Sequence, residues 1–186
     1  MPNFTTVNSL GDSIESSEIT DGNITYVKLG SDLEKYELLD TLTFASDRTK
    51  TSETLPAYNN YKLVFSLQGE NNQDNLQMCI NGNTGAIYDS KFISNITTRS
   101  AINGTSCRIG TLMSSHKTEG NLQISGVSSP KANGKLSVTG TTCNSYITDN
   151  FICGSCAIGN AVQLENITIK GTSYDLTGKV KIYGFD

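Results

Sequence analysis

From about Thr41 to the C-terminus, apolar and polar residues alternate along the chain with a period of two. This alternation is typical of β-strands that turn one face to a core and the other to water. In the clearest run, Tyr61, Leu63, Phe65 and Leu67 occupy every second position. Weaker runs of the same kind contain Leu42 and Phe44, Leu76 with Met78 and Ile80, Leu122 and Ile124, Leu136 and Val138, and Val162 and Leu164.

The last run has the same pattern, because Val180 and Ile182 alternate with Lys179, Lys181 and Tyr183. This alternation is again typical of a strand. Every strong periodic signal in the second half of the chain is of the strand type, so the pattern predicts an all-β domain.

Short segments rich in Asn and Gly separate the strand-like runs, for example Asn81-Gly82-Asn83 and Asn133-Gly134. Such segments join antiparallel strands into hairpins, so neighbouring runs are expected to pair. Many short strands with frequent turns predict an antiparallel β-sandwich of jelly-roll type. A change of parity at Glu165-Asn166, between even-numbered and odd-numbered aliphatic residues, predicts a β-bulge.

The N-terminal part of the chain has a different pattern. Residues 31–40 form the best helical candidate, since Ser31 could cap a helix and Glu34 could complete a capping box. We therefore divide the chain into a short extended segment, residues 1–30, and a sandwich domain, residues 31–186.

Residues 1–30 are polar, with single aliphatic residues at uneven intervals. These aliphatics are too sparse to bury a face within one chain, so the segment is either a disordered tail or gains order against copies or a partner. The candidates for anchoring or oligomerisation are Leu10, Ile14, Ile19 and Ile24.

Composition and charge exclude several classes of function. The 186 residues suit one domain, and only 17% of them are charged. The 14 Lys and Arg are scattered and the net charge is −4, so nucleic-acid binding is not expected. No stretch reaches the roughly 18 apolar residues of a membrane span, and the first residues lack the features of a signal peptide. Synthesis in a cytoplasm without membrane insertion is expected.

The five cysteines are an odd number, so they cannot all form disulfides within one chain. Cys153 and Cys156 form a CxxC pair in Gly- and Ser-rich sequence without a helical pattern behind it. Cys107, Cys143 or His116 could complete a zinc site, but their spacing matches no common zinc motif. Free thiols are favoured over a disulfide or zinc, and we predict no metal and no cofactor.

Little in the chain suggests catalysis. His116 is the single histidine and lies in a polar stretch, and no GxSxG elbow is present. The carboxylates of the sandwich region stand mostly beside turn residues, where they favour local hydrogen bonds. The protein is therefore predicted not to be an enzyme.

Sugar binding has more support than catalysis, because aromatic rings near turns can stack on sugars. The chain has no Trp but eight Tyr, of which Tyr58, Tyr88 and Tyr146 lie near expected turns. These three are candidate glycan contacts. The alternative is that they are core or rim residues whose hydroxyl groups reach water, as most tyrosines are.

Several stretches resemble segments of bacteriophage virion proteins. Residues 12–25, which contain Glu-Ile-Thr-Asp-Gly-Asn-Ile, resemble N-terminal segments of phage fibre proteins. Residues 58–65, residues 76–82 and Tyr88 resemble, in order, strands of jelly-roll domains from phage virion proteins. Residues 178–184, Gly-Lys-Val-Lys-Ile-Tyr-Gly, are similar to the last strand of such domains, so the resemblance extends from about residue 40 to the C-terminus.

The resemblance implies a structural protein of a tailed-bacteriophage virion, either a tail or head fibre or a capsid decoration protein. It also implies a homotrimer whose N-terminal segment contacts other virion proteins and whose jelly roll faces outward, towards host-surface glycans. Five cysteines are unusual for this group. A stand-alone, lectin-like carbohydrate-binding module is the alternative hypothesis.

Overall fold

The computed structural model describes residues 36–71, 74–85, 88–94, 97–125, 135–144, 150–157 and 163–186. All of them belong to Tyr36–Asp186, one of the two units into which the chain divides. The predicted anchor residues Leu10, Ile14, Ile19 and Ile24 lie outside the described residues, as does Tyr146.

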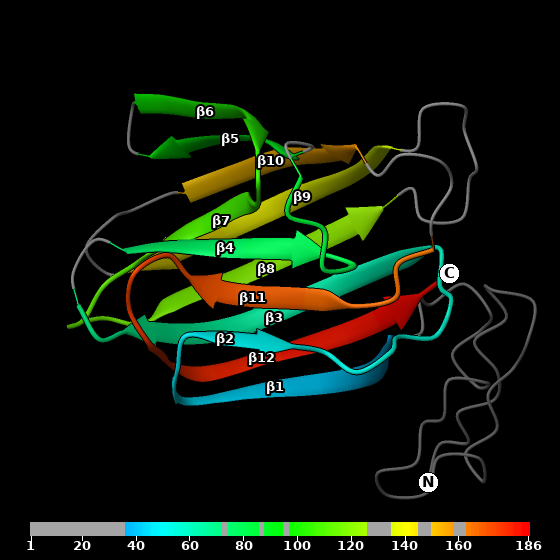
Figure 1. Cartoon of the computed structure of the whole chain (residues 1–186), viewed down its shortest axis with the longest axis horizontal. Helices are drawn as coiled ribbons and strands as arrows, with labels where there is room; N and C mark the ends of the chain where they lie inside the picture. The colour runs from blue at the N-terminus through cyan, green and yellow to red at the C-terminus, as the bar shows by residue number, and fades with distance from the viewer. Residues whose placement is uncertain are drawn as a thin grey trace, which may run out of the picture. The chain divides into compact units, whose positions relative to one another are not determined.

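The described residues form two antiparallel sheets that pack as a β-sandwich, which confirms the predicted all-β class (Figure 1). Along the larger sheet run, in spatial order, β1 (Glu37–Asp47), β12 (Leu176–Phe185), β3 (Asn60–Gly69), β8 (Thr118–Ser125), β9 (Lys135–Asn144), β10 (Asn150–Ala157), β5 (Tyr88–Ser94) and β6 (Thr97–Gly104). The smaller sheet has the order β2 (Thr49–Thr51), β11 (Ile167–Gly171), β4 (Asp74–Ile80) and β7 (Cys107–Leu112).

The core lies between the two sheets. In Figure 1 the smaller sheet lies in front of the larger one, and the β5–β6 hairpin extends beyond it. In β3, β8 and β12, whose side chains the structure describes, alternate residues point inward, as the sequence pattern predicts. The run Tyr61, Leu63, Phe65 and Leu67 is buried, and so are the apolar residues of the other predicted runs that fall within the described strands.

The predicted helix at residues 31–40 is wrong over its second half, because residues 37–40 open strand β1. β1 pairs with β12 from Glu37 onward, and Leu39 packs against the core. Pairing with a central strand outweighs the weak local preference of a segment only two or three turns long.

The expected hairpin between neighbouring runs is wrong for β3 and β4, which lie in different sheets. The turn at Asn81-Gly82 does form, with φ values of 52° and 62° and a bond from Asn83 N–H to the Ile80 carbonyl. It leads the chain from β4 across to the larger sheet instead of back along β4. The consecutive strands β8 and β9 do pair, as the second half of the sequence predicts.

The predicted bulge at Glu165-Asn166 is also wrong, because β11 begins only at Ile167 and pairs regularly with β4. The change of parity falls in the segment that precedes the strand. There the side-chain oxygen of Asn81 accepts the backbone N–H groups of Glu165 and Asn166, at 2.7 and 3.2 Å.

A buried carboxylate holds the loop between β11 and β12. Asp74, at the start of β4, is only 3% exposed. Its Oδ2 accepts the backbone N–H groups of Ser173 and Tyr174, at 3.0 and 3.1 Å. Hydrogen bonds to a charged acceptor are stronger than those between neutral groups, so Asp74 fixes the turn by which the chain enters its last strand.

Replacement of Asp74 by alanine should lower the free energy of unfolding by about 2–3 kcal/mol, because two loop N–H groups lose their acceptor. Urea denaturation of the full chain measures this. Asp175→Ala is the matched control, since the backbone carbonyl of Asp175, and not its side chain, accepts a bond from Glu70 at 3.1 Å. Equal losses in the two variants would contradict the assigned role.

Candidate binding site

A shallow hollow of about 520 Å³ lies on the outer face of the larger sheet, which is the face turned away from the smaller sheet. Strands β12, β3, β8 and β9 form it. Its outward side chains include Val64, Ser66, Glu119, Asn121, Lys179 and Lys181. These residues alternate along their strands with buried core residues, so the strand pattern that builds the core also builds the hollow.

The register of the sheet sets the side chains of the hollow in two rows that cross the strands. In the first row Lys179 pairs with Ser66, and Ser66 pairs on its other side with Glu119. Cys143 of β9 completes this row opposite Glu119. The row therefore runs from a basic end on β12 to an acid and a thiol on β8 and β9.

The second row is next to the first and has one basic end. Lys181 pairs with Val64, Val64 with Asn121, and Asn121 with Thr141. Tyr183 follows two residues after Lys181 and also lines the hollow. Hydroxyl, amide, aliphatic and aromatic groups thus face the solvent within one small area.

Two glycines lie next to the hollow at points where no side chain fits. A Cβ atom added to Gly178 would lie 2.1 Å from the carbonyl oxygen of Ser66, and one added to Gly140 would lie 2.2 Å from that of Asn121. Both glycines have positive φ values, 126° and 157°. Glycine inside a strand often marks the close approach of another backbone, and here Gly178 lets β12 lie close to β3 while Gly140 lets β9 lie close to β8.

A third glycine, Gly120 of β8, reaches the floor of the hollow and lies against the ring of Phe65. A Cβ atom at this position would lie 2.2 Å from the ring. Because Phe65 is buried in the core, its ring cannot move away without disturbing other packed side chains.

Gly120→Ala should therefore destabilise the protein by about 1–3 kcal/mol, through overpacking against Phe65. Thermal or urea unfolding of the full chain measures the effect. Gly110→Ala is the control, because an added Cβ there meets its nearest neighbours at an ordinary 3.6–3.7 Å. A Gly120 variant as stable as the Gly110 variant would contradict the packing argument.

The hollow carries more positive than negative charge, although the whole chain has a net charge of −4. Lys179 and Lys181 stand on one side and Glu119 on the other. Neither lysine forms an ion pair with a described carboxylate, whereas elsewhere Lys50 pairs with Asp47 at 3.0 Å. Neither lysine of the hollow is therefore neutralised by a described carboxylate within 4 Å.

The predicted glycan contact Tyr88 is wrong, because its side chain is 0% exposed. Its hydroxyl group accepts the Ile80 N–H at 2.9 Å and donates to the carbonyl of Asn83 at 2.8 Å. The ring thus anchors the turn after β4 from inside the core and cannot stack on a sugar.

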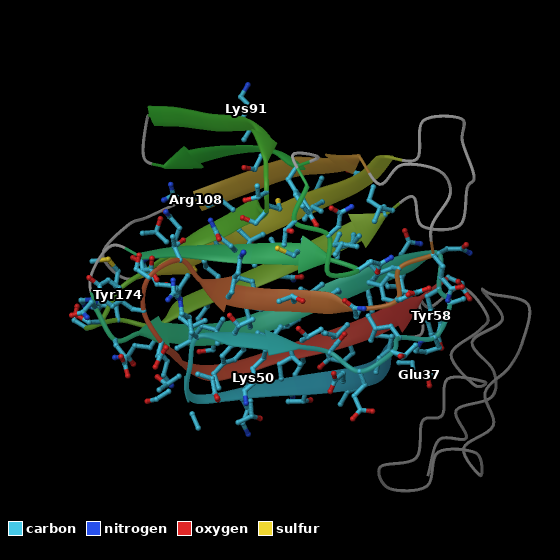
Figure 2. The ribbon with its side chains drawn as sticks, in the orientation of Figure 1. Glu37, Lys50, Tyr58, Lys91, Arg108 and Tyr174 are labelled. Atoms are coloured by element: carbon cyan, nitrogen blue, oxygen red, sulfur yellow. The ribbon has the colours of Figure 1, made fainter. Side chains whose placement is uncertain are left out.

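Tyr58, the second predicted contact, is half-buried and held at one end of the sandwich. Its ring lies where a Cβ of Gly184 would be, and its hydroxyl donates to Glu37 Oε2 at 2.5 Å. Figure 2 shows Glu37 and Tyr58 together at this end, with Tyr174 at the opposite end. Tyr58 joins β1 to the chain before β3 and is not part of the hollow.

The bond to Glu37 raises the pKa of the Tyr58 phenol above its ordinary value, since the bond holds the proton on the phenol. Because the pKa of Tyr58 is higher in the folded than in the unfolded protein, its bond to Glu37 stabilises the folded state below about pH 10. This stabilisation is lost as the pH rises through the pKa of Tyr58 in the folded protein.

Glu37→Ala should lower the pKa of Tyr58 towards its ordinary value of about 10, which tyrosine-specific NMR titration of the full chain can follow. Glu53→Ala is the control. The described contact between Glu53 and β1 is made by its backbone N–H, which donates to Asp40 at 3.1 Å and is kept in the alanine variant. An unchanged Tyr58 titration in Glu37→Ala would contradict the assignment.

Tyr183 is the tyrosine of the hollow, and it was not among the candidate glycan contacts, which were tyrosines near expected turns. Its odd-numbered position on the last strand could have identified it, because Tyr183 shares the outward face of that strand with Lys179 and Lys181. Position on a strand face was thus a better guide to the site than proximity to a turn.

Cys79 and Cys143 are free thiols, the first buried and the second exposed, and Cys107 is buried. Burial raises the pKa of the Cys79 thiol. Cys107 faces the core while Cys143 lies in the hollow on the outer face, so these two cannot bind one zinc ion together. Cys153 and Cys156 lie on β10, where the structure describes no side chains.

Within the described residues, no group of three or more His, Cys, Asp or Glu could hold a metal ion. His116 is in the connection between β7 and β8, where its Nδ1 lies 2.7 Å from Ser115 Oγ, and it does not line the hollow. No helix of the described part is long and apolar enough to cross a membrane.

Comparisons with known proteins give no match: no family model, no curated protein and no solved structure matches this chain.

Proposed function

We propose that the chain is a structural protein of a tailed-bacteriophage virion, a short fibre or a capsid decoration protein, and that its sandwich is a jelly roll. The jelly roll faces outward, and residues 1–30 attach it to other virion proteins. The observation that carries this proposal is the order in which the strands pair.

The strand pairs of the sandwich are nested along the chain. β1 pairs with β12, β2 with β11, β3 with β8, and β4 with β7. A long antiparallel hairpin that folds across itself into two sheets produces this nesting, and it is the order expected of a jelly roll. The hairpins β5–β6 and β9–β10 are then insertions that widen one sheet.

Three further observations favour a virion role over the many other functions that this fold supports. Jelly rolls recur in viral capsid and lectin domains. The order of strand motifs resembles that of phage virion proteins. The sparse aliphatics of residues 1–30 suit a segment that packs against copies of itself, which favours a homotrimer.

The mass of the full chain in solution, by native mass spectrometry or light scattering, tests the proposed trimer. Replacement of Leu10, Ile14, Ile19 and Ile24 by serine should convert the trimer to monomers, because the aliphatics that bury one another are lost. A chain that starts at Ser31 should behave in the same way, with an unchanged circular dichroism spectrum of the sandwich.

A trimer that survives both changes would place the interface in the sandwich and favour a decoration protein. A wild-type monomer whose N-terminal segment is also dispensable for incorporation into phage particles would contradict the proposal.

The hollow favours a second candidate, a stand-alone carbohydrate-binding module. Its hydroxyl and amide groups offer hydrogen bonds to sugar hydroxyls, and its aliphatic and aromatic groups offer apolar surface to a sugar ring. The two candidates differ in where the protein is found. Mass spectrometry of purified phage particles would detect a virion protein, whereas a solitary module would be absent from the particles.

A further inference from the structure

We infer that the hollow binds an acidic glycan, whose carboxylate groups meet Lys179 and Lys181. This inference deepens the proposed outward-facing role, on which it rests for its biological setting. The binding chemistry itself depends only on the described side chains.

The direct cross-strand partners of the two lysines are uncharged. On β1 their cross-strand partners are Thr43 and Thr41. On β3 their partners are Ser66 and Val64. Two residues apart on one strand, the lysine Cα atoms are about 7 Å from each other. They therefore form a compact pair of positive charges without a neighbouring acid.

The acid of the hollow is too far away to neutralise this pair. Glu119 stands two strands from Lys179, with Ser66 between them. Two strand spacings separate their backbones by about 10 Å, which leaves room for a ligand between the lysine and the carboxylate. A ligand that carries an anion at one end and hydroxyl groups at the other matches this distribution of charge.

The other side chains favour a saccharide over a protein partner. The centre of a protein interface is enriched in large aromatic residues, Met and Arg, whereas Tyr183 is the single aromatic side chain on the outward face of the hollow. Asn121, Thr141 and Ser66 offer hydrogen bonds to sugar hydroxyls. Val64, 39% exposed, and Tyr183 offer apolar surface to the C–H face of a sugar ring.

The test uses the full chain and an array of paired oligosaccharides. One member of each pair carries a uronic or sialic acid, and in the other the carboxylate is reduced to an alcohol. We expect binding to at least one acidic member and a loss of tenfold or more when its carboxylate is reduced. Binding should also weaken at high salt, since the charges are exposed.

The double variant Lys179→Gln/Lys181→Gln should lose at least tenfold in affinity for the acidic member. Lys91→Gln/Lys117→Gln is its matched control, because it removes the same charge from exposed lysines outside the hollow and should bind like the wild type. Lys91 lies on β5, away from the four strands of the hollow (Figure 2).

The inference is overturned if no acidic member binds, if the reduced members bind as tightly, or if the Lys179/Lys181 variant keeps its affinity. A change in oligomeric mass in that variant would instead assign the hollow to contact between copies, and would also overturn it. The proposed virion role is judged separately, by solution mass and by incorporation into particles, so each proposal can fail without the other.

Discussion

The structure depends on where the last strand goes. β12 lies between β1 and β3, so the C-terminal residues close the larger sheet beside the first strand that the structure describes. Its register with both neighbours sets which side chains face the core, for example Val180 opposite both Leu42 and Phe65. A slip of one residue would move Val180 and Ile182 to the solvent and Lys179 and Lys181 into the core. Burial of an unpaired lysine is costly, so charge and apolarity fix the same register.

This single register also creates the hollow. Lys179 and Lys181 are brought into rows with Glu119 and Asn121, although about 60 residues separate them along the chain. The inward face of the same strands carries the apolar core, and close backbone approaches at Gly178 and Gly140 shape the floor. Stability and the candidate site are therefore properties of opposite faces of the same strands.

The sequence predicts which face of a strand is buried far better than it predicts which strands pair. The alternation of Tyr61, Leu63, Phe65 and Leu67 is local, and it correctly identified a strand and its buried face. Strand pairing, in contrast, depends on residues far apart in the sequence. The Asn and Gly near residue 82 predicted a turn, but nothing nearby showed that the chain would cross to the other sheet. The second half of the helix predicted over residues 31–40 is wrong for a related reason, since β12, far away in the sequence, supplies the partner that makes residues 37–40 a strand.

Tyrosine shows the same limit at the level of single residues. Tyr88 and Tyr58 lie near turns, and in both a polar partner captures the hydroxyl: the turn backbone for Tyr88 and Glu37 for Tyr58. A phenol that is bonded within the fold stabilises it, and its ring is then committed to packing. Tyr183 stands two residues after Lys181 on β12, so both side chains point to the outward face, and Tyr183 lines the hollow. Its cross-strand partner on β3 is Lys62.

The separation of the two faces has a consequence for specificity. Substitutions at outward positions such as Val64 and Asn121 change what the hollow presents, while their inward neighbours keep the core intact. Surface substitutions usually alter stability by less than about 0.5 kcal/mol, so the outer face can vary with little cost to the fold. Gly178, Gly140 and Gly120 are the exceptions, because a side chain at any of them would disturb the backbone or the core beneath the hollow. A protein that must meet changing surfaces is well served by such a division, in which the glycines maintain the shape of the floor and the polar side chains above it set the chemistry.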